Sequence, residues 1–207
     1  MFSDNMLLPI TLLAACTLIW WWPEIRLALR LPGHTPKLAM DTGAGLAQIA
    51  LPSSWRQTSA LNAHAALQAA DRFHNRYVMV ISESLADFDT TVNLRDFSQR
   101  AVQRMMKKLD VANVDGPFER AVAALDAVQY EFTARVRGQR ITYLHTTVLG
   151  RRAFHQVICW SASSSFNRQA FERVLEGFAE QPGPVPLRPH PGATLTPPEP
   201  GSQYTIH

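Results

Sequence analysis

The sequence is poor in cysteine, and it lacks the short motifs of common catalytic and nucleotide-binding sites. Its 207 residues include only two cysteines, Cys16 and Cys159, too few for a disulfide framework. It has no glycine-rich phosphate loop and no G-x-G-x-x-G fingerprint, and its seven histidines lack the spacing of a metal site. These absences predict a protein that is not an enzyme and that holds no metal and no cofactor.

The chain also lacks a concentrated basic stripe. Its formal net charge is only +3, and the densest basic points are the pairs Lys107–Lys108 and Arg151–Arg152. Proteins that bind nucleic acid usually gather Lys and Arg on one face. The scattered charge therefore predicts no nucleic-acid partner.

Charge is missing altogether between Asp4 and Glu24. Nineteen residues of helix would span roughly 28 Å, close to the hydrocarbon thickness of a bilayer. The tryptophans Trp20–Trp22 stand at the end of this run, as interfacial tryptophans do, and Pro23 follows them. The pattern predicts a membrane anchor that stays on the mature protein.

A lipoprotein signal is the alternative interpretation of the same segment. Residues Leu13–Cys16 (LAAC) resemble a lipobox, in which Cys16 would be lipidated, although the preceding residues MFSDN contain no Lys or Arg. The two interpretations differ in the side of the membrane. The basic residues Arg26 and Arg30 after an uncleaved anchor favour a cytoplasmic domain, whereas a lipoprotein would face away from the cytoplasm.

The remaining chain divides by composition. Residues 23–44 contain Pro and Gly breaks and are predicted to be a connector, and residues 45–180 carry the periodic apolar patterns of a folded domain. Residues 181–207 contain eight prolines and few large apolar side chains, which predicts an extended, disordered tail. Residues 1–22 form the hydrophobic segment described above.

Helix and strand patterns alternate within residues 45–180. The alanine-rich stretch 59–73 is predicted to form a short helix, and residues 77–82 (YVMVIS) are apolar on both faces, which indicates a covered central strand. Apolar stripes predict one helix capped by Asn93 and another over residues 167–178.

A three-stranded meander is predicted over residues 128–161. Apolar and polar residues alternate in all three strands, and Gly138–Gln139 and Gly150–Arg151 are predicted to form the two turns. In this register Val136 opposes Ile141, and Ile141 opposes Trp160, which we expect to be buried under a helix. The fold class is therefore α+β, with a largely antiparallel β-sheet packed by helices.

The order of these elements resembles the PsbP-like superfamily, in its bacterial DcrB and LpqN branches. The resembling pieces are IALPSSW, YVMVISESLADFD followed by NLRDFSQ, and the meander segment QYEFTARVRGQRITYLHTTVLGRRAFHQVICWS. The resemblance implies a PsbP-like α/β sandwich. It also implies an anchored or exported bacterial protein, and a related branch contains chaperones of type VI secretion effectors.

The candidate site lies on the meander. In the predicted register Tyr143, His145, Gln156 and Trp160 share one face and mark a small ligand cleft, whereas His155 points to the other face. A buried histidine that is hydrogen-bonded beside Gln156 is the alternative interpretation of His145, because buried polar groups generally find partners.

The sequence is compatible with three functions. The first is a non-enzymatic binding or scaffold protein of the bacterial envelope, tethered to the membrane and presenting its sheet or tail to a protein partner. The second is a chaperone or adaptor for secreted effectors, which predicts an exposed apolar groove and a homodimer. The third is an enzyme with an unrecognised site.

Overall fold

The computed structural model describes residues 37–41, 45–59, 61–186 and 188. The chain divides into two units, Met1–Lys37 and Leu38–His207, and the described fold belongs almost entirely to the second. The predicted anchor or signal, residues 1–22, and the lipidation candidate Cys16 lie outside the described residues. Within the described part, no helix is both long enough and apolar enough to cross a bilayer.

The strands form two mostly antiparallel sheets. The smaller sheet has three strands in the order β1-β2-β10, and the larger has seven in the order β3-β4-β5-β9-β8-β7-β6. The strands are β1 (Lys37–Asp41), β2 (Ala47–Pro52), β3 (Arg56–Gln57), β4 (Leu67–Asp71), β5 (Arg76–Ser84), β6 (Asp110–Val122), β7 (Leu125–Val136), β8 (Gln139–Leu149), β9 (Ala153–Ala162) and β10 (Phe178–Glu180). The helices are η2 (Leu85–Asp87), α2 (Leu94–Met106), η3 (Ser163–Ser165) and α3 (Arg168–Glu176). The predicted α+β class is confirmed.

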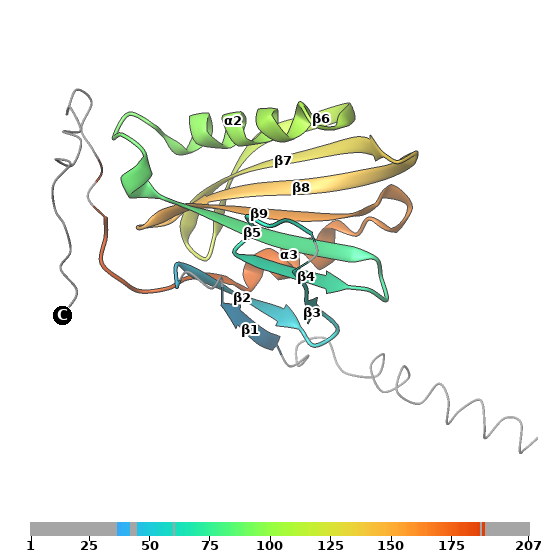
Figure 1. Ribbon diagram of the computed structural model, residues 1–207, viewed down its shortest axis with the longest axis horizontal. Coiled ribbons are helices and arrows are strands. Elements are labelled where there is room, and N and C mark those ends of the chain that lie inside the picture. Colours follow the sequence, from blue (N-terminus) through green and yellow to red (C-terminus); the bar gives the residue numbers. More distant parts are fainter. Residues whose placement is uncertain (1–36, 42–44, 60, 187, 189–207) are drawn as a thin grey trace, which may run out of the picture. The chain divides into compact units, whose positions relative to one another are not determined.

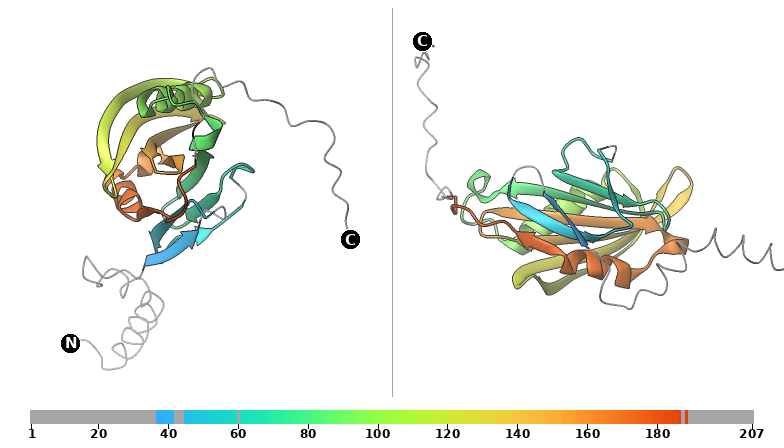
Figure 2. Two further views of the ribbon diagram at one scale, coloured as in Figure 1. Left: turned by 90° about the vertical axis from the view of Figure 1, so that its left-hand side faces the viewer. Right: turned by 90° about the horizontal axis from the view of Figure 1, so that it is seen from below.

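The large sheet is covered from two sides. Figure 1 shows α2 on one side of the sheet and α3 with the small sheet on the other, and Figure 2 shows the curvature of the large sheet in two further views. Most side chains of β8 and β9 are buried on both faces. One core joins α3 and β2 to the sheet through Phe171, Ile49 and Val157. A second core joins α2 to the opposite face through Val102 and Ile158.

Both predicted helices are present, and each begins at an asparagine cap. The Asn93 side chain accepts a hydrogen bond from the backbone N–H of Asp96, and the Asn167 side chain accepts one from that of Ala170. These caps satisfy N–H groups that the first helical turn leaves free. The predicted cap at Asn93 is therefore confirmed.

The meander is present, but both predicted turns are wrong by one residue. The first loop is Arg137–Gly138, since Val136 pairs with Gln139, and Gly138 takes a left-handed φ of 81°. The second is Arg151–Arg152, since Leu149 pairs with Phe154 and the N–H of Gly150 donates to the carbonyl of Ala153. Each error displaces the cross-strand partner by two residues, for example Ile141 opposite Ala162 in place of Trp160. Because side chains alternate with a period of two, the face of every residue is still as predicted.

Two assignments in the first third of the chain are corrected. The alanine-rich stretch forms strand β4, because Ala69 and Ala70 pair with Val78 and Tyr77 of β5 and are buried there. Its helix propensity is overridden by this tertiary pairing. The predicted connector 23–44 contains strand β1, so the folded part begins before residue 45.

The β6–β7 hairpin turn contains unfavourable residues. Ala123 and Ala124 both have left-handed φ angles, 50° and 62°, which an Asn-Gly turn would adopt at less cost. We expect Ala124→Gly to raise the free energy of unfolding by about 0.5–1 kcal/mol, because glycine removes the left-handed penalty and only part of the gain is lost to unfolded-chain entropy. Urea denaturation measures the change. The matched control Ala121→Gly, within strand β6, should destabilise the protein, and equal effects of the two variants would contradict the argument.

Candidate functional site

An aromatic row crosses the α2 side of the large sheet. Tyr77 of β5, Trp160 of β9, Tyr143 of β8 and Phe132 of β7 are successive cross-strand partners. Their rings stack with centroid distances of 5.5, 6.3 and 5.0 Å in that order. The row passes from partly exposed at Tyr77 and Trp160 to buried at Tyr143 and Phe132. Stacking across four strands fixes the orientation of the two partly exposed rings.

A polar chain lies beside this row. His145 is fully buried, and its Nε2 lies 3.2 Å from Oε1 of Gln156. The amide nitrogen of Gln156 donates to Glu83 over 2.7 Å, and Glu83 lies 3.9 Å from Arg104 of α2. Because the Gln156 nitrogen faces a carboxylate, its oxygen faces the histidine, so Nε2 carries the proton. Burial lowers the pKa of His145 to about 4, and the neutral ring is the folded form at pH 7.

The structure therefore brings together the four residues predicted for the cleft. Tyr143, His145 and Gln156 are buried, and the predicted hydrogen bond between His145 and Gln156 is confirmed. Trp160 is partly exposed and stacks on Tyr77, so the expectation that it is buried under a helix is wrong. Binding of a small ligand by these four residues stays a prediction.

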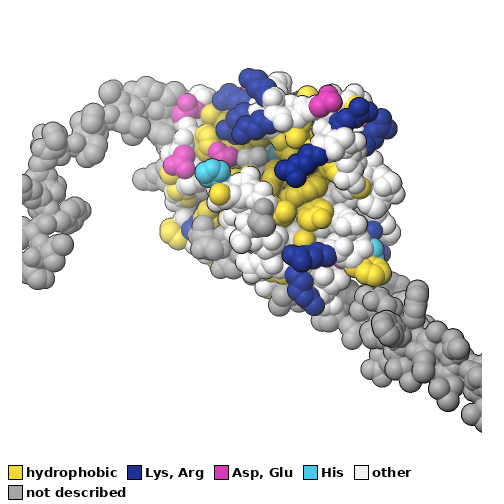
Figure 3. Space-filling view, turned by 45° about the vertical axis from the view of Figure 1, so that its right-hand side comes forward, with side chains coloured by type: hydrophobic (Ala, Val, Ile, Leu, Met, Phe, Trp, Pro, Cys, Tyr) yellow, Lys and Arg dark blue, Asp and Glu magenta, His cyan; other side chains and the backbone are white. Residues whose placement is uncertain are grey.

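Strand β5 carries the feature that the sequence analysis missed. Val78 and Val80 are fully buried, but Tyr77, Met79 and Ile81 on the alternate face are only partly buried. The most extensive contacts of helix α2 are with β6, β7 and β8, and β5 is less covered by it. Together with Trp160, these three residues form what we call the open face. Figure 3 shows hydrophobic side chains gathered on one surface of the molecule with Lys and Arg side chains around them.

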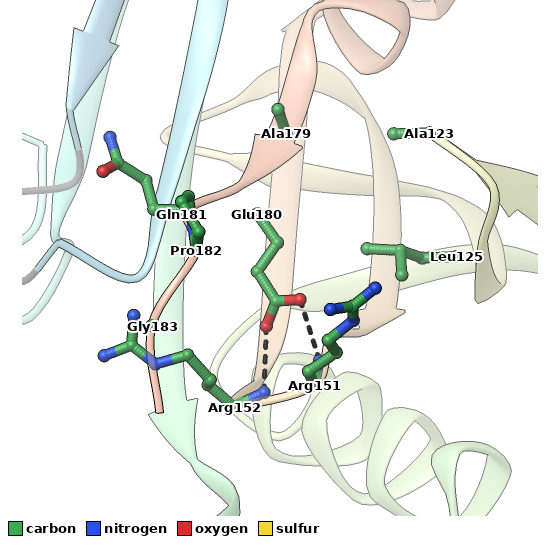
Figure 4. Close-up of a pocket in the computed structure, with 9 residues that line it drawn as sticks. All are labelled: Ala123, Leu125, Arg151, Arg152, Ala179, Glu180, Gln181, Pro182 and Gly183. Atoms are coloured by element: carbon green, nitrogen blue, oxygen red, sulfur yellow. Dashed lines mark hydrogen bonds between the residues drawn. The ribbon is translucent and has the colours of Figure 1, made fainter. Parts of the chain in front are cut away.

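A pocket of about 420 Å³ lies at the turn between β8 and β9 (Figure 4). The residues that line it are Ala123, Leu125, Arg151, Arg152, Ala179, Glu180, Gln181, Pro182 and Gly183. The Glu180 carboxylate accepts the backbone N–H groups of Arg151 and Arg152, each over 2.9 Å. The guanidinium of Arg152 donates to the carbonyl of Gly45 over 3.1 Å. Most of the charge in this pocket is therefore engaged in holding the turn.

Behind the pocket, Ser82, His155 and Glu180 resemble the composition of a catalytic triad. Ser82 Oγ lies 2.9 Å from Nδ1 of His155, but Nε2 lies 3.8 Å from Glu180, beyond a hydrogen bond. A Cβ on Gly150 would overlap the Glu180 carboxylate and stand 2.8 Å from this Nε2, so only glycine fits here. His155 is also fully buried, and burial lowers its pKa. The geometry supports a structural role for these residues, which is to hold the turn between β8 and β9 in place.

Two further points concern reactive groups. Cys159 is buried, and burial raises the pKa of its thiol, which disfavours the reactive thiolate. Among the residues that the structure describes, no three His, Cys, Asp or Glu side chains are grouped as metal ligands. As predicted, His145 and His155 point to opposite faces.

Comparison with known proteins places the fold. No protein-family model matches the chain, and no curated protein matches it in sequence. Several solved structures are similar to it, and two are described here. Cyanobacterial PsbP (CyanoP) from Synechocystis sp. PCC 6803 shares 13% identity with a TM-score of 0.51, over 72% of this chain and 95% of CyanoP. LpqN of Mycobacterium tuberculosis, described as involved in cell envelope biogenesis, shares 15% identity with a TM-score of 0.52, over 70% of this chain and 91% of LpqN.

The fold is PsbP-like. The predicted PsbP-like fold is thereby confirmed, and the LpqN structure shares it. At these identities the likeness concerns the fold and does not carry over site residues.

Acid should weaken this PsbP-like domain through its buried histidines. In the folded chain the pKa of His145 is lowered from 6.5 to about 4, so between these values the unfolded chain binds the additional proton. The contribution of neutral His145 to the free energy of unfolding is fully present above pH 6.5 and is lost as the pH falls toward 4. For a pKa shift of this size the loss is about 3 kcal/mol. His155 adds to the loss in the same direction.

Urea titrations between pH 7.5 and 4.5 measure this dependence. We expect His145→Gln to flatten it, because the glutamine amide can still donate to Gln156 but does not titrate. A variant with the same pH dependence as the parent chain would contradict the assignment to His145.

Proposed function

We propose that this chain is a non-enzymatic binding or scaffold protein of the bacterial envelope, tethered by its N-terminal segment, that binds a protein partner through the open face. The observation that carries the proposal is the partly exposed apolar side of β5. An apolar strand in the interior of a sheet is normally covered on both faces. Here the second face, formed by Tyr77, Met79 and Ile81, remains partly exposed to water.

The composition of the open face suits a protein interface. Trp and Tyr are enriched among residues that dominate binding energy, and methionine adapts to irregular surfaces. Trp160 is held between Tyr77 and Tyr143, so little side-chain freedom is left to lose on binding. Arg104 stands beside the face through its contact with Glu83, which favours a partner segment with acidic residues next to apolar ones.

The envelope location is supported from two directions. The similar structure of LpqN belongs to a protein described as involved in cell envelope biogenesis. The charge-free run between Asp4 and Glu24 has the length of a membrane span. An uncleaved anchor and a lipoprotein linked at Cys16 both place the domain at a membrane, on opposite sides of it.

A chaperone or adaptor for secreted effectors is the second candidate function. The observation that favours it is a groove beside α2, about 330 Å³ in volume, whose apolar end is formed by Phe88, Val92 and Phe97. This candidate requires a homodimer, whereas the scaffold proposal does not. An enzyme that uses the turn pocket is the third candidate. The carboxylate of that pocket already accepts two backbone N–H groups, which leaves it poorly placed to act as a base.

Site-specific photocrosslinking in the native membrane tests the proposed interface. A benzoylphenylalanine at Met79 should give a discrete crosslinked protein species, because this side chain lies on the open face and is partly exposed. The control position is Gln169, an exposed residue of α3 on the opposite side of the large sheet. Crosslinks of equal yield at both positions, or none at Met79, would contradict the proposal.

The tether has its own test. The protein should remain in membranes washed with high salt or at alkaline pH, because apolar burial and not charge holds it there. The intact mass then separates the two tethers. A chain that begins near Met1 supports the anchor, whereas an acylated chain that begins at Cys16, and whose processing is blocked by Cys16→Ser, supports the lipoprotein. Recovery in the soluble fraction would exclude both.

A further inference from the structure

Two turns that are far apart in the sequence lie at the same end of the large sheet. The turn Arg72–Asn75 joins β4 to β5, and the turn Arg137–Gly138 joins β7 to β8. Arg76, which begins β5, pairs with Ser161 of β9, and Thr142 near the start of β8 pairs with the same serine. Because β5 and β8 both start at this level, the turns that precede them project from one end of the sheet.

The C-terminus of α2 lies at this end too. The helix ends at Met106, and the chain enters β6 at Asp110, which pairs with Arg135 of β7. Lys and Arg side chains that are exposed or partly exposed gather here, and we call them the basic end: Arg72, Arg76, Lys107, Lys108, Arg135, Arg137 and Arg140. Figure 3, in which this side of the molecule comes forward, shows Lys and Arg side chains spread over it. They outnumber the formal net charge of the whole chain, +3, so the fold has segregated the charge.

The acidic residues at the same strand ends do little to balance the basic end. Asp71, the last residue of β4, is buried, and its carboxylate accepts a hydrogen bond from Nδ1 of His74 over 2.7 Å. Asp110 is exposed and stands opposite Arg135. The surface therefore keeps an excess of positive charge, which attracts an anionic partner from a distance.

The β4–β5 turn adds an exposed aromatic ring to this charge. Phe73 is 74% exposed, more than any other large hydrophobic side chain in the part of the chain that the structure describes. Its ring meets the ring of His74 edge-on at a centroid distance of 4.8 Å, and His74 is bonded to the buried Asp71. These contacts hold Phe73 at the tip of the turn, next to Arg72. Basic side chains beside an exposed apolar one form the combination with which peripheral segments bind anionic lipid headgroups.

We propose that the basic end docks on the anionic headgroups of a membrane, with Phe73 inserted among them. Each Lys or Arg held near such a surface strengthens binding by about fivefold. A nucleic acid also presents phosphates, but single strands are usually bound in a groove that offers several aromatic side chains to the bases. The basic end consists instead of two projecting turns and a helix terminus. Since Tyr77 of the open face follows Arg76 directly, a domain docked in this way would hold the open face beside the membrane.

Photocrosslinking of the full-length chain to lipid tests the docking. Benzoylphenylalanine replaces Phe73, and the chain is reconstituted into vesicles of phosphatidylcholine, either alone or mixed with an equal amount of phosphatidylglycerol. We expect mass spectrometry to detect lipid adducts at position 73 in the anionic vesicles, with a yield at least about fivefold lower in the neutral ones.

The matched control for this probe is the same substitution at Phe118 of β6, which is also exposed. Phe118 pairs with Gln129, which lies about 23 Å along β7 from the strand end at Val136, at about 3.3 Å per residue. No adduct at position 73, equal yields in the two kinds of vesicle, or equal yields at positions 73 and 118 would overturn the inference.

Removing charge gives a second criterion. Arg137→Gln with Arg140→Gln should lower the adduct yield at position 73 by at least about fivefold, because two cations of the basic end are lost. The matched control, Arg95→Gln with Arg151→Gln, removes two exposed arginines from the opposite end, in the first turn of α2 and in the β8–β9 turn. It should leave the yield unchanged. Equal losses in the two double variants would mean that net charge alone is responsible and would contradict docking by the basic end.

An added single-stranded oligonucleotide distinguishes lipid from nucleic acid. Adducts with the oligonucleotide at position 73, and none with lipid, would replace the proposal by a nucleic-acid interface. The two kinds of vesicle also separate the docking from the tether of the proposed function, which the inference does not require. A chain that stays with neutral vesicles but forms no adduct at position 73 in anionic ones is tethered without docking. A chain that binds the anionic vesicles only, with adducts at position 73, docks without a tether.

Discussion

Burial of β8 and β9 on both faces is the constraint on which the other elements depend. A strand that is apolar on two sides needs a layer on each of them, and α2 supplies one while α3 and the small sheet supply the other. Helix α2 has thirteen residues, and its most extensive contacts are with β6, β7 and β8. The open face exists because the sheet is wider than the helix that covers it.

The polar contacts around the two buried histidines follow from the same constraint. His145 and His155 belong to neighbouring central strands but point to opposite faces. Each histidine therefore needs its own series of polar side chains that leads toward the surface. His145 reaches the surface through Gln156 and Glu83, and His155 contacts Ser82. Both series of side-chain contacts begin in the core and end near a groove or pocket. The same residues therefore resemble a ligand site although their contacts link parts of the structure.

The meander could be predicted from the sequence because alternation determines the face of each residue independently of the exact turn. Moving the loop from Gly138–Gln139 to Arg137–Gly138 changed the partner of Val136 but left Tyr143, His145 and Gln156 on a common face. The strand β4 could not be predicted, since its alanines favour a helix until β5 pairs with them. The open face was missed for a similar reason. The two-sided apolar pattern of β5 shows that both faces prefer burial, but the length and position of α2 decide which of them is covered.

The pairing of β2 with β10 gives the domain a mechanical property. These strands come from the two ends of the folded part and are joined by antiparallel pairs from Ile49–Phe178 to Ala47–Glu180. The N–H of Ala50 also donates to the carbonyl of Gly177 over 2.7 Å. Force applied to the chain before β1 would therefore act on the backbone hydrogen bonds between β2 and β10. Because the small sheet shares no strand with the large one, opening of these pairs would leave the strand pairing of the large sheet unbroken.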